Sequence, residues 1–326
     1  PTLDKPPRRR IRRGDRPVAR LADDCDCSTL PPAVSPRGIP LPCVSRELTR
    51  IFSDLHFGDR ASRVRNLPQL RPLLAGVDHL ILNGDTLDTR PSEFPGHTSH
   101  CRTVVADFFS RAVGRVTYIT GNHDGDFSPI HHLDLGGGAV FVIHGDILFD
   151  SIVPWSRDAG LVRRLIRERL DLLPEGDRED LDQRIAIFRA VATTIPQRHQ
   201  SEPRALRYRL RYLADTVWPP HRAFSVLHAW RVMPGRSAAL LRRHRPAAKF
   251  IVTGHSHRPG VWTFPDGITV LNTGSFTLPL GAWAVDLFPG CLAVRRIERR
   301  QGNYHPGPVV AEFPLAGPGR IPETPT

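Results

Sequence analysis

The sequence contains no hydrophobic run long enough to cross a membrane. Its apolar stretches fall short of the 18 or more residues that a transmembrane helix needs. The N-terminus carries arginines without an apolar segment behind them, unlike a secretory signal. The five cysteines are odd in number and irregularly spaced, which argues against a disulfide framework and fits a reducing compartment. We therefore expect a cytoplasmic protein.

The positive charge is concentrated in two segments of the 326-residue chain. Residues 1–50 carry 11 basic against 6 acidic side chains, and residues 150–250 carry 20 against 11, whereas the whole chain has a net charge of +12. The remainder is therefore slightly acidic. A basic surface favours anionic partners such as nucleic acid, anionic lipid or a phosphorylated substrate, although exposed helix faces also carry charge for solubility alone.

Three regions differ in sequence pattern. Residues 1–48 are rich in Pro and Arg and are predicted to be a disordered tail before a domain over 49–326. Within that domain, short apolar runs alternate at first with helical stretches near 62–75 and 99–112, which indicates α/β units with parallel strands, while the later runs suggest an antiparallel meander. The strands are expected at 49–53, 78–82, 115–120, 139–143, 249–253, 261–264, 268–272, 282–287 and 291–297.

Residues 155–247 are predicted to form a helical insert. Amphipathic patterns occur at 160–173 and 204–218, where leucines, isoleucine and valines recur at helical spacing among arginines. The apolar positions are Val162, Leu165, Ile166, Leu170 and Leu173 in the first, and Leu206, Leu210, Leu213 and Val217 in the second.

Five short motifs place metal-binding side chains at the ends of expected strands. A single D-x-H after a strand is usually an ordinary loop. Five strand ends that all carry Asp, Asn or His indicate a ligand site, because such sites lie at the carboxyl ends of strands in α/β sheets. Histidines outside the motifs, namely His79, His97, His100, His131 and His132, are expected to be solvated. The motifs are Asp54-Leu55-His56, Gly84 to Asp88, Gly121 to Asp124, His144 to Asp146 and Gly254 to His257.

The donor atoms suffice for two divalent cations. Asp85 would bridge them, because a carboxylate has two oxygens, while Asp88 and Asp146 would orient ligands. The mixed N and O donor set suits Mn²⁺, with Fe or Zn²⁺ as alternatives. Two such ions would clamp the oxygens of an in-line displacement at phosphorus and make hydroxide available from a shared water. One ion would be held by Asp54, His56, Asp85 and His257, the other by Asp85, Asn122, His144 and His255.

These motifs, in this order, resemble the calcineurin-like metallophosphoesterase superfamily. The resemblance implies a four-layer α/β/β/α sandwich and the same metal ligands. It also implies that His123 is not a ligand but lies over the substrate phosphoryl group as a proton donor or charge stabiliser, oriented by Asp124.

The substrate is left open by the motifs. The helical insert between H-G-D and G-H-S-H-R-P resembles the UDP-2,3-diacylglucosamine hydrolases, which implies a lid over acyl chains, a lipid-linked substrate and peripheral contact with an anionic inner membrane. That family usually has Arg at the position of His123, so the chain departs from it. A nuclease acting on DNA or RNA is the main alternative, followed by a phosphoprotein phosphatase and by a scaffold without activity.

Overall fold

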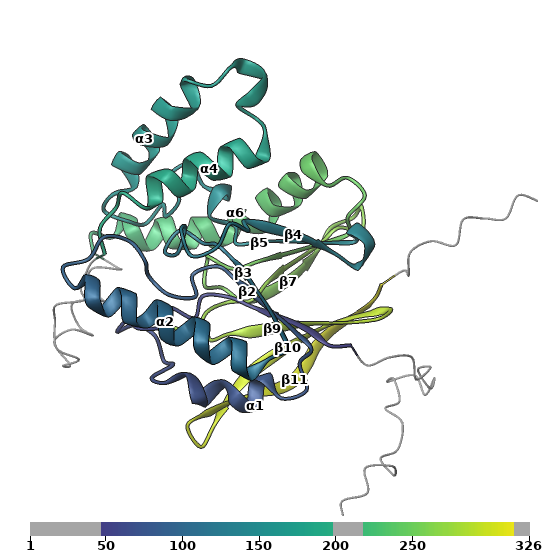
Figure 1. The fold of residues 1–326 in the computed structure, drawn as a ribbon. Helices are drawn as coiled ribbons and strands as arrows, with labels where there is room; N and C mark the ends of the chain where they lie inside the picture. Colours follow the sequence, from purple (N-terminus) through teal and green to yellow (C-terminus); the bar gives the residue numbers. More distant parts are fainter. Residues whose placement is uncertain (1–46, 198–217, 316–326) are drawn as a thin grey trace, which may run out of the picture. The chain divides into compact units, whose positions relative to one another are not determined.

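Two mixed β-sheets form the centre of the computed structural model, which describes residues 47–197 and 218–315 (Figure 1). One sheet has the strand order β11-β10-β9-β1-β2-β3 and the other β4-β5-β6-β8-β7. The strands are β1 (Thr49–Phe52), β2 (His79–Asn83), β3 (Arg115–Ile119), β4 (His132–Leu135), β5 (Val140–Ile143), β6 (Phe250–Thr253), β7 (Gly260–Thr263), β8 (Thr269–Asn272), β9 (Trp283–Phe288), β10 (Cys291–Arg300) and β11 (Asn303–Pro314).

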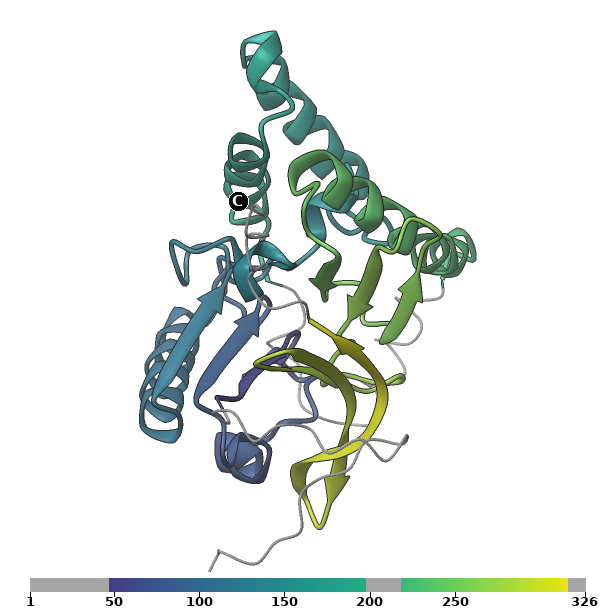
Figure 2. The same cartoon turned by 90° about the vertical axis from the view of Figure 1, so that its right-hand side faces the viewer.

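Helices cover the outer face of each sheet, as Figures 1 and 2 show. One apolar cluster joins α1 and α2 to the six-stranded sheet, another joins α3, α4 and α6 to the five-stranded sheet, and a third fills the space between the sheets. The four-layer α/β/β/α prediction is therefore confirmed. The helices are α1 (Arg71–Leu74), α2 (Pro95–Ala112), α3 (Ala159–Asp171), α4 (Leu181–Ala192) and α6 (His221–His244), with 3-10 turns η2 (Leu67–Leu70), η3 (Gly136–Gly138), η4 (Asp146–Leu148) and η5 (Glu175–Asp177).

All nine expected strands are present, but two further strands were missed. Strand β4 alternates polar and apolar residues over only four positions before three glycines, which is too short to identify a strand. Strand β11 contains Pro306 and Pro308, which an edge strand tolerates because one side needs no hydrogen bonds. The later strands pair antiparallel with their neighbours along the chain, as expected, but they do not form one meander. Strands β7 and β8 pair in one sheet, whereas β9, β10 and β11 form a meander in the other. The helix expected over 62–75 is reduced to η2 and the single turn α1, because Pro68 and Pro72 interrupt the ladder of amide donors.

The insert packs its helices on the five-stranded sheet. Val162 and Ile166 of α3 are buried there, as the amphipathic pattern predicted. The second pattern, at 204–218, lies outside the described residues except for Trp218, and so does the predicted tail except for residues 47 and 48. Within the described residues, no helix combines the length and the hydropathy that crossing a membrane requires.

Candidate metal centre

The carboxyl ends of parallel strands from both sheets meet at the candidate site. Strands β1, β2 and β3 are mutually parallel neighbours in one sheet, and β5 and β6 are parallel in the other. Each expected motif directly follows one of these strands, so folding gathers all five motifs at one edge. Six of the seven predicted ligands fall into groups whose donor atoms lie within 4.8 Å of one another, and these are Asp54, His56, Asp85, His144, His255 and His257.

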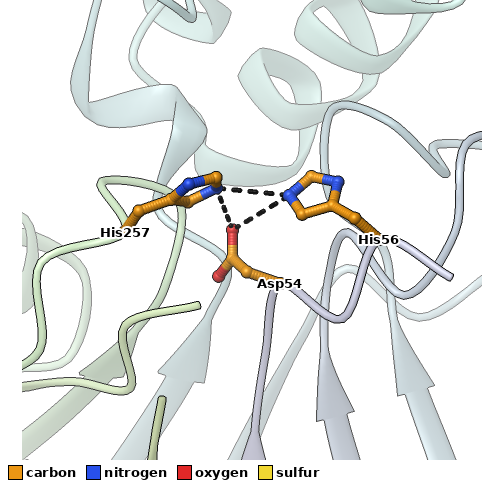
Figure 3. A group of neighbouring side chains, drawn as sticks. All are labelled: Asp54, His56 and His257. Atoms are coloured by element: carbon orange, nitrogen blue, oxygen red, sulfur yellow. Dashed lines mark hydrogen bonds and ion pairs between the residues drawn. The ribbon is translucent and has the colours of Figure 1, made fainter. Parts of the chain in front are cut away.

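The first group consists of Asp54, His56 and His257 (Figure 3). His257 Nε2 lies 3.1 Å from Asp54 Oδ1 and 3.2 Å from His56 Nε2, and His56 Nε2 lies 3.8 Å from the same Asp54 oxygen. Three donor atoms therefore point toward one another across a space that a single cation could fill.

The second group consists of Asp85, His144 and His255, all of them buried. Asp85 Oδ2 lies 3.3 Å from His144 Nε2 and 3.9 Å from His56 Nε2, so one oxygen faces both groups. The other oxygen, Oδ1, accepts the backbone N–H of His123 at 2.8 Å. This position of Asp85 fits the prediction that it would be shared by two cations.

The backbone is strained where it presents these ligands. Asp54, His56, Asp85, His255 and His257 all have φ between 46° and 63°, in the left-handed region that residues with a side chain rarely adopt. Such conformations cost of order 1–3 kcal/mol each and persist where the surrounding structure enforces them, which is typical of functional sites.

Two motif glycines allow the loops to approach one another closely. A Cβ at Gly121 would lie 2.6 Å from the Asp85 amide nitrogen and would also meet the Asp85 carboxylate. A Cβ at Gly254 would meet Asp54 Oδ2 and would lie 2.8 Å from the Ser53 Cβ. Glycine at these positions is therefore required by the space around the ligands.

The hydrogen-bond pattern leaves the expected donor atoms available to a cation. His144 Nδ1 donates to the Asn83 carbonyl at 2.9 Å, and His255 Nε2 donates to the Ile152 carbonyl at 2.9 Å, so each ring keeps its other nitrogen for a ligand role. Within the described residues, the buried Asn122 Oδ1 accepts no hydrogen bond. Asp54 Oδ1 and His144 Nε2 have only the ion-pair contacts given above, without well-directed hydrogen bonds. These atoms fit divalent cations.

The protonation states also suit cations. Burial lowers the pKa of His56 to about 3 and that of His255 to about 4, so both rings are neutral and have a lone pair to donate. For His144, burial acts in the same direction, but the Asp85 carboxylate outweighs it and raises the pKa to about 10. A cation bound between these two residues would have to displace the proton on His144.

His123 is positioned by Asp88. His123 Nδ1 lies 2.9 Å from Asp88 Oδ2, which also accepts Arg90 Nη2 at 2.7 Å. The prediction that Asp124 orients His123 was wrong, because the Asp124 carboxylate accepts backbone N–H groups instead. These belong to Asp85 at 3.1 Å, Thr86 at 2.7 Å and Gly121 at 2.6 Å. Asp124 thus holds the Asp85 loop against the Gly121 loop.

Asp146 was expected to orient a ligand, but it pairs with Arg189 of the insert. Both side chains are buried, and Arg189 also donates to Thr120, from Nε to the hydroxyl at 3.0 Å and from Nη2 to the carbonyl at 2.8 Å. One off-motif histidine, His79, is likewise not solvated, and a second, His131, is only half-exposed. His79 is buried with Nε2 2.8 Å from Thr117 Oγ1, and His131 Nδ1 lies 2.6 Å from Thr120 Oγ1.

A cavity of about 300 Å³ lies over the ligand clusters. Its floor includes six predicted site residues, among them Asn122 and His123, and its walls include side chains that the motifs did not reveal. Arg90 could have been suspected, because it follows the G-D-x-x-D motif by two residues. The remaining wall residues had no signal of their own, since they come from segments distant in sequence. They are Val153, which precedes the insert, and the insert residues Trp155, Ser156, Arg157, Asp158, Ile195, Pro196 and Arg222.

A family model described as calcineurin-like phosphoesterase matches residues 49–259. No curated protein sequence matches the chain. Among solved structures, Vps29 from Cryptosporidium parvum is 13% identical, with 82% of this chain and 98% of that chain covered and a TM-score of 0.38. A dimetal phosphatase from Danio rerio is 13% identical, with coverage of 82% and 98% and a TM-score of 0.39. A predicted phosphoesterase from Streptococcus pneumoniae is 16% identical, with coverage of 83% and 99% and a TM-score of 0.33.

Proposed function

Because the chain belongs to the calcineurin-like phosphoesterase family, and is therefore a phosphoesterase, we propose that it hydrolyses a phosphodiester or pyrophosphate bond in an amphiphilic substrate such as a lipid-linked nucleotide sugar. The observation that carries this proposal is the composition of the cavity wall opposite the ligand clusters. Val153, Trp155, Ile195 and Pro196 are apolar and Arg157 and Arg222 are cationic, while Ser156 and Asp158 line the same wall; all of them except Val153 come from the insert. Such a wall suits a substrate with both an apolar chain and a phosphate.

Two divalent cations, which we propose to be Mn²⁺, would be held by the predicted ligands. Asp54, His56 and His257 would hold one, Asn122, His144 and His255 the other, and Asp85 would contact both. When bound, such ions activate water and neutralise charge on phosphoryl oxygens.

His123 would supply the proton for the leaving oxygen. Its Nδ1 faces Asp88, whereas its Nε2 lies 4.0 Å from Asp85 Oδ2 and the ring lines the cavity. Burial and the Arg90 guanidinium, whose Nη2 lies 2.9 Å from His123 Nδ1, lower the pKa of His123, but the carboxylates of Asp85 and Asp88 together outweigh them and raise it, which favours the protonated ring. A protonated imidazole at this place can act as a general acid.

A hydrolysis panel with Mn²⁺ tests the substrate class. We expect turnover of UDP-diacylglucosamine and of a simple aryl phosphodiester, with the acylated compound having the lower KM. Trp155→Ala should raise KM for the acylated substrate several-fold and leave that for the aryl diester nearly unchanged, because contacts to the acyl chain are lost. Metal content should stay at the native level, which must be measured because the Trp155 ring lies 6.0 Å from that of His255. Trp262→Ala, outside the cavity lining, is the matched control. Preferred cleavage of single-stranded DNA, with a rate that falls steeply with salt, would replace this proposal by the nuclease.

Asp85→Asn tests the dinuclear arrangement. The substitution removes the charge shared by both groups, so elemental analysis should show loss of metal and the rate should fall by orders of magnitude. A fully active protein with one tightly held ion would contradict it.

A further inference from the structure

Exposed apolar side chains gather beside the cavity mouth. Of the ten large apolar side chains that are exposed in the described part of the chain, five occur in two short segments. Leu227 of one segment and Leu280 of the other line the same groove, so the segments are neighbours in space. The five are Trp218, Phe224 and Leu227, exposed by 57–70%, and Leu278 and Leu280, exposed by 62% and 45%.

The groove between these segments is cationic. Arg231, Arg258 and Arg296 line it, while the acidic residue in its lining, Glu298, pairs with Arg300. The Arg258 guanidinium lies 5.9 Å from the Trp230 ring centre and 5.6 Å from that of Trp262. The arginines therefore present net positive charge next to the protruding apolar side chains.

We propose that this docking surface, formed by Trp218, Phe224, Leu227, Leu278 and Leu280 with Arg231, Arg258 and Arg296, binds the headgroup region of an anionic lipid bilayer. Protruding aromatic and aliphatic side chains can enter the boundary between headgroups and acyl chains while arginines contact lipid phosphates. A two-fold contact with a second copy would bring like patches together and set arginines against arginines. Three of the five apolar residues are leucines, which offer bases no ring for stacking.

Docking would turn the metal centre toward lipid. The Trp230 indole donates to the Ser256 carbonyl at 2.8 Å, and Ser256 lies between His255 and His257. Arg222 and Thr277, from the same two segments, line the cavity. This consequence rests on the proposed function, whereas docking itself does not.

Vesicle co-sedimentation with the full chain tests the surface. We expect binding to vesicles of phosphatidylglycerol and phosphatidylcholine that is at least tenfold tighter than to pure phosphatidylcholine and weakens with salt. The double variant Phe224→Ser/Leu227→Ser should lose at least tenfold in binding. The control Leu172→Ser/Val310→Ser changes exposed apolar side chains on α3's C-terminal end and on β11, and should bind as the native chain does. Both variants should hydrolyse the aryl phosphodiester normally.

Absence of vesicle binding, or equal binding by the two double variants, would overturn the proposal. So would a dimer in sedimentation analysis that Phe224→Ser/Leu227→Ser dissociates, or oligonucleotide binding that this variant abolishes. Vesicle binding by a chain that hydrolyses none of the phosphoesters in the panel would leave docking in place and contradict only the proposed function.

Discussion

His123 and Asp88 form a pair in which the carboxylate holds the ring by its Nδ1 atom at 2.9 Å. Asp88→Asn should lower kcat by roughly ten- to hundredfold, because the amide holds the imidazole less firmly and no longer favours its protonated form. His123→Ala should lower kcat by about 10²–10⁴, the range for a lost general acid. Metal content, measured by elemental analysis, should stay at the native level in both. Loss of metal in His123→Ala would instead show that His123 is a metal ligand.

Close approach of the loops predicts that alanine is not tolerated at two motif glycines. Gly121→Ala and Gly254→Ala should each cause loss of metal and of activity, since the added Cβ displaces Asp85 or Asp54. Gly160→Ala is the matched control, because a Cβ there meets nothing within 4 Å and α3 gains a better helix former. Native metal content in the Gly121 and Gly254 variants would show that the loops move apart easily.

The buried ion pair between Asp146 and Arg189 joins the insert to the H-G-D motif. Arg189→Met should reduce the free energy of unfolding by about 3–5 kcal/mol, because it leaves a buried carboxylate without its counter-charge. Adding Asp146→Leu should recover much of this loss. Arg164→Met, on an exposed part of α3, should stay within about 0.5 kcal/mol of the native chain in urea unfolding. If Arg164→Met lowered the free energy of unfolding as much as Arg189→Met, the loss could not be assigned to the buried ion pair.

Metal affinity should rise with pH. The pKa of His144 is about 10 in the metal-free protein, where burial opposes but Asp85 prevails, so the ring carries a proton at pH 6 and at pH 8. A cation must displace that proton, and the apparent affinity should therefore increase about tenfold per pH unit, or about a hundredfold across this range. Competition with a chelator at both pH values measures it. His305→Gln, on β11, should keep the slope, and a flat dependence would contradict the displaced proton.

The sequence was sufficient to place each motif at the end of a strand and to identify the types of side chain in the candidate metal centre. Apolar runs that end in Asp, Asn or His are local features, and the carboxyl ends of parallel strands must lie at one edge. The nine strands and the gathering of Asp54, Asp85, His144 and His255 followed from this. Strands β4 and β11 were not predicted, because a strand at the edge of a sheet need not show a regular apolar pattern.

The tertiary structure alone decided what contacts each motif side chain. Asp88, Asp124 and Asp146 are all acids within motifs, and nothing in their spacing tells which of them meets His123. The Asp88 carboxylate contacts an imidazole and an arginine, that of Asp124 accepts hydrogen bonds from three backbone amides, and that of Asp146 pairs with an arginine from α4. These partners come from different parts of the chain, which only the fold brings together. The same holds for the cavity wall and the docking surface, since packing α6 beside the loop at 278–280 joins side chains about fifty residues apart, which no local pattern connects.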